Sequence, residues 1–139
     1  EERNMKLNEG GEKSEVYSIG KINQKIYKCI TEDIITEEVI ITDNQIQHIK
    51  DRHPEAYNKV LKYTGGNKYP DYIIRDKHAY TGLIIKRIQT EEGFLQIVLR
   101  LCTSGDEHGY KNSVISCWKI SERRLQNYLR NKEILYSRE

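Results

Sequence analysis

The sequence predicts an α+β domain in which two N-terminal helices pack on a mainly antiparallel sheet, with a short helix near the C-terminus. Residues 43–63 carry helix caps and helical spacing, whereas apolar residues alternate with polar ones in several runs after residue 72. Helices followed by a run of strands is the order of an α+β domain with its helices on one face of the sheet.

The chain of 139 residues has the length of one domain, and about a quarter of it is Leu, Ile, Val or Phe, enough for a hydrophobic core. We interpret the polar residues 1–14 as a flexible lead-in and residues 15–139 as a single domain. No apolar run approaches the length of a membrane span, so no membrane is expected as a partner. A start at Glu1 instead of Met suggests a piece of a longer or processed chain.

The first regular elements are expected to be a pair of strands. Residues 15–22 and 25–31 place Val, Ile or Tyr at near-alternate positions, and Asn23 with Gln24 between them suggests a tight turn. Residues 38–41 (EVII) predict either a short strand or the approach to a helix, because periodicity cannot decide so short a run.

Two short helices are expected next. A capping box at residues 42–45 predicts a helix to about residue 53. Pro54 cannot continue that helix but can open a second one over residues 54–63, which the glycine pair at 65–66 would end.

The rest of the chain is expected to form an antiparallel meander and a last helix. Ser121 would cap that helix, which runs to about residue 131, and residues 134–136 would form a short tail. The four strands of the meander are expected at residues 72–75, 81–89, 94–102 and 113–120.

Charge is distributed unevenly along the chain. Residues 1–43 carry 10 acidic and 6 basic side chains, whereas residues 44–139 carry 11 acidic and 17 basic ones. A positive potential on the larger part favours a polyanion such as RNA, although solvated surface lysines would give the same excess.

Cysteine and histidine spacing argues against a metal. Cys29, Cys102 and Cys117 form no CxxC pair, and we expect three free core thiols in a reducing compartment. Neither they nor the four histidines show zinc-binding spacing, so neither a metal ion nor another cofactor is expected.

The densest cluster of functional side chains is His48, Arg52 and His53, in HIKDRHPE. A spacing of four places His48 and Arg52 on one helix face, and His53 lies at the helix end. Two imidazoles and a guanidinium are the groups that an enzyme needs to move protons at a phosphodiester and to hold its charge. The alternative is that His53 satisfies a buried carbonyl and His48 is a surface residue.

Over about residues 43–136 the chain resembles the phage-associated barnase/EndoU/colicin/RelE-like (BECR) nuclease domains of phage and polymorphic toxin proteins. The resemblance rests on the order and spacing of HIKDRHPE, YPDYII, LIIKRI, LQIVLRL and NSVISCWKIS, followed by a short helix and ILY. It implies a small helix-plus-antiparallel-sheet fold and a metal-independent endoribonuclease. The implied reaction is attack of a ribose 2′-hydroxyl on phosphorus, which leaves a 2′,3′-cyclic phosphate and a 5′-hydroxyl.

The resemblance also implies catalytic residues. His48 and His53 would act as base and acid in unassigned order, Arg52 and Lys86 would stabilise charge, and Ser116 would donate a hydrogen bond to the phosphate. The family more often has threonine at the last position, so Ser116 keeps the hydroxyl but not the methyl group. Lys86 is alternatively an outward residue on a half-exposed strand.

Four further residues are candidates for binding substrate. Arg100 interrupts an apolar strand, so it belongs either to a structural ion pair or to the phosphate site. Ser113, expected on the same side of its strand as Ser116, is a rival for the hydroxyl role. Tyr110 and Tyr128 would stack on bases, unless their rings pack in the protein with only the hydroxyls in water.

The resemblance implies RNA as the substrate and an immunity or antitoxin protein as a partner. It also implies a cytoplasmic site of action, with delivery as part of a longer secreted or phage protein. The alternative is a non-catalytic RNA-binding or protein-docking module on the same fold.

Overall fold

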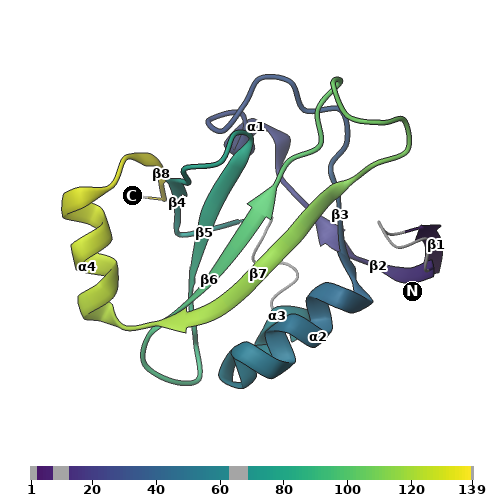
Figure 1. The fold of residues 1–139 in the computed structure, drawn as a ribbon. Coiled ribbons are helices and arrows are strands. Elements are labelled where there is room, and N and C mark those ends of the chain that lie inside the picture. The colour runs from purple at the N-terminus through teal and green to yellow at the C-terminus, as the bar shows by residue number, and fades with distance from the viewer. Residues whose placement is uncertain (1–2, 8–12, 63–68, 139) are drawn as a thin grey trace.

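The computed structural model describes residues 3–7, 13–62 and 69–138, whose strands form one sheet of order β1-β2-β3-β7-β6-β5-β4-β8 (Figure 1). Every neighbouring pair is antiparallel except β3 and β7. The strands are β1 Arg3–Leu7, β2 Lys13–Lys21, β3 Glu38–Thr42, β4 Tyr72–Arg75, β5 Thr81–Arg87, β6 Phe94–Arg100, β7 Asn112–Ile120 and β8 Ile134–Ser137. The helices are α1 Gln24–Tyr27, α2 Asp43–Arg52, α3 Pro54–Lys62 and α4 Glu122–Asn131. The α+β class and the mainly antiparallel sheet are therefore confirmed.

The expected placement of two helices at the N-terminus is wrong, because three strands and α1 precede α2. The sheet begins inside the stretch expected to be a flexible lead-in, where β1 pairs antiparallel with β2. This pairing gives the outer edge of β2 its backbone hydrogen-bond partners. Residues 8–12 of the expected lead-in lie outside the described residues.

The expected second strand at residues 25–31 is also wrong. Asn23 is the N-cap of α1, and its side chain accepts a hydrogen bond from the Lys25 backbone N–H at 3.1 Å. Tyr27 at the end of this short helix is fully buried. Asparagine is favoured both in tight turns and at helix N-caps, so the residue that suggested a hairpin starts a helix here.

Thr42 is confirmed as the N-cap of α2, since its hydroxyl accepts a hydrogen bond from the Gln45 backbone N–H at 3.2 Å. The undecided residues 38–41 belong to strand β3. α3 starts at Pro54 as expected, whereas the glycine pair expected to end it lies outside the described residues.

The predicted meander is confirmed, because β4, β5, β6 and β7 pair in sequence order. Ser121 caps α4, and its hydroxyl accepts a hydrogen bond from the Arg124 backbone N–H at 3.1 Å. The expected tail forms strand β8, which pairs antiparallel with β4 at the sheet edge. None of the helices among the described residues is long and apolar enough to cross a membrane.

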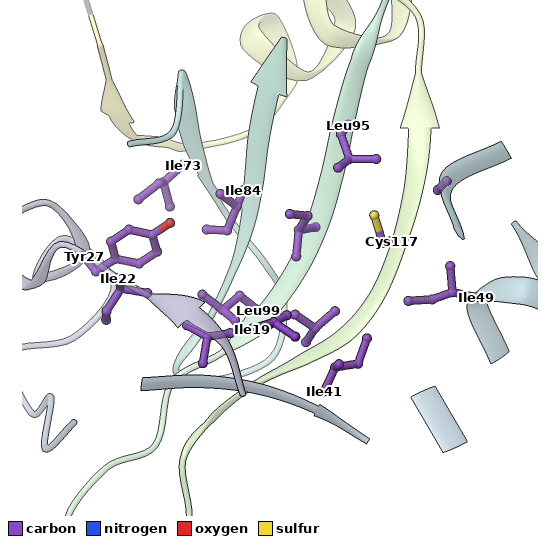
Figure 2. Packing of buried hydrophobic residues seen from close by; sticks show 14 of the residues in the cluster. Ile19, Ile22, Tyr27, Ile41, Ile49, Ile73, Ile84, Leu95, Leu99 and Cys117 are labelled. Carbon is purple, nitrogen blue, oxygen red and sulfur yellow. The ribbon is translucent and has the colours of Figure 1, made fainter. Parts of the chain in front are cut away.

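The main hydrophobic core lies on one face of the sheet, which we call the covered face. Figure 2 shows Ile84, Leu95 and Cys117 of the central strands on the side where Tyr27 and Ile49 pack. Cys29, Cys102 and Cys117 are free thiols, and burial raises the pKa of each.

The opposite face of the central strands, which we call the open face, is covered mainly by α4 at one end. Leu125 and Tyr128 of α4 pack there with Phe94 and Ile120. In Figure 1 no helix crosses in front of β5, β6 and β7, and α1 lies behind them.

Candidate active site

The corner between α2 and α3 is fixed by the backbone of His53. Its N–H donates to the Ile49 carbonyl at 2.7 Å, and its own carbonyl accepts from the Ala56 N–H at 2.9 Å. Pro54 cannot donate to the α2 ladder, so the chain changes direction at this point. The His53 side chain is 30% exposed, which leaves its ring accessible beside the corner.

The corner brings three rings together. The His53 and Trp118 ring centroids lie 5.2 Å apart with planes inclined by 34°, and the His48 and His53 centroids lie 6.2 Å apart. Trp118 belongs to β7, which pairs with β3 only at Asn112 and Ser113. No other described strand pairs with the rest of that edge, and α2 and α3 lie beside it (Figure 1).

Glu55 ties the start of α3 to this edge of β7. Its Oε2 atom accepts the Lys119 backbone N–H at 3.4 Å and lies 4.0 Å from Nδ1 of His53. A carboxylate at this distance attracts a protonated imidazole. Glu55 is not among the residues expected at the site; the signal for it in the sequence is an acidic residue in the first turn of α3, two positions after His53.

A network of charged side chains borders the corner. Glu91 accepts from Lys59 at 3.0 Å and from Lys119 at 3.2 Å, and these hydrogen bonds lower the pKa of its carboxyl group. A groove of about 670 Å³ opens here. The groove is lined by Glu55, Arg87, Glu92, Gly93, Lys119, Ile120, Ser121 and Glu122.

Arg52 and Lys86, the two expected charge stabilisers, lie in different places. Arg52 is exposed near the corner, with no ion pair to any described residue. Lys86 donates from Nζ to the Tyr69 carbonyl at 2.9 Å. Lys86 pairs with Leu95, whose side chain lies on the covered face, so Lys86 lies on that face too. Ser116 pairs with Val98, which is three positions after Leu95 on β6. Because side chains alternate along a strand, Val98 and Ser116 lie on the opposite, open face. The structure does not bring Lys86 and Ser116 together.

Ser113 and Ser116 share the open face because of a β-bulge. Val98 pairs with Ser116 and Arg100 with Ser113, although a regular strand would turn residues three apart to opposite faces. The register shift near Ile115 supplies the extra residue that returns both hydroxyls to one side. The expectation that these two serines face the same way is confirmed.

Arg100 was expected either in a structural ion pair or at the phosphate site, and the structure shows the ion pair. Its guanidinium binds the two carboxylate oxygens of Asp106 at 2.9 and 3.2 Å. Asp106 also accepts the Thr103 backbone N–H at 2.8 Å. The hydrogen bond from Arg100 is the main cause that lowers the pKa of Asp106 to about 2. Arg100 thus anchors the loop after β6.

The two tyrosines considered for base stacking have different environments. Tyr128 is buried in the α4 cluster, with cationic groups of Arg124 and Lys132 at 5.9 and 5.4 Å from its ring centroid. Tyr110 is exposed in the loop before β7. Only the Tyr110 ring is therefore accessible to a base in this conformation.

Within the described ranges, no group of three or more His, Cys, Asp or Glu side chains is arranged to hold a metal ion. Comparison with protein-family models, with curated proteins and with solved structures finds no match to this chain.

Proposed function

We propose that this protein is a metal-independent endoribonuclease with its active site at the α2–α3 corner. The observation that supports this proposal best is the pair of imidazoles, His48 and His53, whose ring centroids lie 6.2 Å apart at an accessible position. General acid–base groups must come within about 2.6–3.2 Å of the protons they transfer. Two rings at this separation can flank a single phosphodiester.

In the proposed reaction, His48 takes the proton of the ribose 2′-hydroxyl as that oxygen attacks phosphorus. The P–O5′ bond breaks, and protonated His53 gives its proton to the leaving 5′-oxygen. We assign His53 as the acid on geometry, since the Glu55 carboxylate lies 4.0 Å from its Nδ1 atom. The products are a 2′,3′-cyclic phosphate and a 5′-hydroxyl end.

Arg52 supplies positive charge beside the two histidines. Its guanidinium is one helical turn from His48 and exposed, so it can form charge-assisted hydrogen bonds to a phosphate. Ser116 lies on the open face, but its hydroxyl is buried, so we assign it no part in the chemical step. Lys86 is held at the Tyr69 carbonyl, so we give it no role in the reaction.

A second candidate function is a non-catalytic RNA-binding module on the same fold. It is favoured by the ion pair of Arg100 with Asp106 and by the position of Lys86, because two cations expected at the phosphate are engaged elsewhere. The excess of basic residues in the larger part of the chain fits both functions.

The two functions are separated by incubating the purified protein with a 5′-labelled RNA in EDTA. A ribonuclease of the proposed kind yields fragments that end in a 2′,3′-cyclic phosphate, and it leaves DNA of the same sequence intact because deoxyribose lacks the nucleophile. His108→Gln, which changes an exposed histidine far from the corner in sequence, is the matched control for His53→Gln. Cleavage that requires added magnesium, or RNA binding with no cleavage, would reject the proposal.

A further inference from the structure

Two polar side chains on the open face are buried without hydrogen-bond partners among the described residues. Gln96 is 1% exposed and Ser116 is 8% exposed. The Gln96 Oε1 atom and the Ser116 Oγ atom each have no partner. Buried polar atoms almost always form hydrogen bonds in native proteins, because their desolvation is otherwise uncompensated. Packing of β6 alone does not explain a glutamine in the apolar run FLQIVLR.

The two side chains are neighbours. Gln96 is directly opposite Trp118 and Val98 directly opposite Ser116, so Gln96 and Ser116 are diagonal neighbours on adjacent strands. Both project from the open face, where β5 contributes Ile85 beside Gln96. The polar pair is therefore surrounded by apolar residues of the cluster that α4 joins, which includes Ile85, Val98 and Trp118.

Trp118 connects this pair to the candidate active site. Its indole is half-buried, lies across from Gln96 and contacts the His53 ring. Among the described residues no strand pairs with β7 beside Trp118, so the indole can move outward without breaking a sheet pairing. Because Trp118 is directly opposite Gln96, an outward movement would open space beside the Gln96 amide and present an aromatic face to a base.

We infer that Gln96, Ser116 and Trp118 form a nucleobase subsite that prefers adenine; this inference rests on the proposed function. A primary amide presents an acceptor and a donor side by side, which pair with the N6 amino group and N7 of adenine. The Gln96 Oε1 atom accepts from N6 and the amide nitrogen donates to N7. The Ser116 hydroxyl rotates to contribute a further hydrogen bond, and Trp118 stacks on the ring.

Trp118 is the only tryptophan of the chain, so its fluorescence reports on this subsite directly. The probes are two 2′-O-methyl RNA hexamers that cannot be cleaved, one all uridine and one with a single central adenine. We expect the adenine hexamer to change Trp118 emission and to bind with a Kd about tenfold lower than the all-uridine hexamer, in the range that a bidentate amide contact gives.

The decisive variant is Gln96→Leu, which removes the amide. We expect it to bring the two Kd values to within twofold of each other, with an unchanged or higher melting temperature because an unpartnered polar group is gone. Gln96→Met has a similar length without the amide and serves the same purpose if the leucine variant folds poorly. Gln126→Leu, on the exposed side of α4, is the matched control and should keep the tenfold ratio.

Equal affinity of the unsubstituted protein for both hexamers would overturn the subsite, and so would a Gln96→Leu variant that keeps the ratio. Neither result depends on cleavage. RNA cleavage without an adenine preference would leave the ribonuclease proposal standing and reject the subsite. An adenine preference in a protein that does not cleave RNA would support the subsite and reject the ribonuclease proposal.

Discussion

The imidazole of His53 packs against the indole of Trp118, with ring centroids 5.2 Å apart. The two residues come from a helix end and from a strand that are distant in the sequence. Glu55 reinforces the contact, because it accepts the backbone N–H of Lys119, the residue after Trp118. The proposed proton donor is thus held on the edge of β7, and its position depends on the docking of α3 against that strand.

Replacing His53 by glutamine should lower the rate of RNA cleavage at least about 100-fold, the lower end of what general acid–base groups contribute. The fold should hardly change, because the backbone hydrogen bonds of the corner do not involve the ring. Initial rate and melting temperature are measured for each variant, and His108→Gln should match the unsubstituted protein in both. A loss of rate that merely follows unfolding would make His53 a structural residue.

The rate should depend on pH as a bell with both limbs between about pH 5 and 8.5, because the active form needs one neutral and one protonated imidazole. The apparent pKa values that the two limbs report belong to the coupled pair of histidines and not to either residue alone. If His48 is the base, His48→Gln suppresses the acidic limb, and His53→Gln suppresses the alkaline limb. The opposite result would exchange the two roles. A flat profile for folded protein would remove both histidines from the reaction.

Lys86→Ala should change turnover less than about threefold, well below the contribution of a charge-stabilising group. Nζ of Lys86 binds the Tyr69 carbonyl, and the residue lies on the opposite face of the sheet from Ser116. Arg52→Ala, measured in the same assay, should reduce turnover more. A large loss for Lys86→Ala with normal stability would show that the lysine reaches the substrate, in agreement with the role implied by the family resemblance.

Asn112→Ala should lower the free energy of unfolding by about 2–4 kcal/mol, because each buried group left without its partner costs about 1–3 kcal/mol. Asn112 is fully buried, accepts the Cys102 N–H and donates to the Thr36 carbonyl, both at 2.8 Å. Urea unfolding measures the change. The exposed Asn127→Ala should stay within about 0.5 kcal/mol of the unsubstituted protein. A similarly small effect at Asn112 would mean that water replaces both contacts.

Acid should weaken the loop that Asp106 anchors. The folded-state pKa of Asp106 is about 2, below the value of about 3.9 for an unfolded chain. Its contribution is therefore fully present above about pH 4 and is lost as the pH falls toward about 2. Asp106→Asn should cost about 1 kcal/mol at pH 7, because solvent partly screens Arg100. The variant should also lose less stability than the parent between pH 4 and 2 in urea unfolding. An equal acid dependence in both proteins would assign the effect to other carboxylates.

Local signals in the sequence predicted most of the secondary structure from residue 38 onward. The N-cap at Thr42, the helix start at Pro54 and the N-cap at Ser121 act over three or four residues, so the sequence alone contains the whole interaction. The alternation in the meander is local in the same way. Alternation gave the wrong prediction at residues 25–31. Asn23, just before them, is favoured both in a tight turn and as a helix N-cap, and only the burial of Tyr27 decides between the two.

The sequence by itself determined the candidate histidines, because His48, Arg52 and His53 lie within two helical turns and their proximity follows from helix geometry. Only the tertiary structure decided what faces them. Trp118 and Glu55 reach His53 because α3 docks on the edge of β7. The bulge near Ile115 brings Ser113 onto the same face as Ser116, and the register of β5, β6 and β7 places Lys86 on the opposite face. Sheet register is a long-range property, since the pairing of distant strands fixes it and no local pattern contains it.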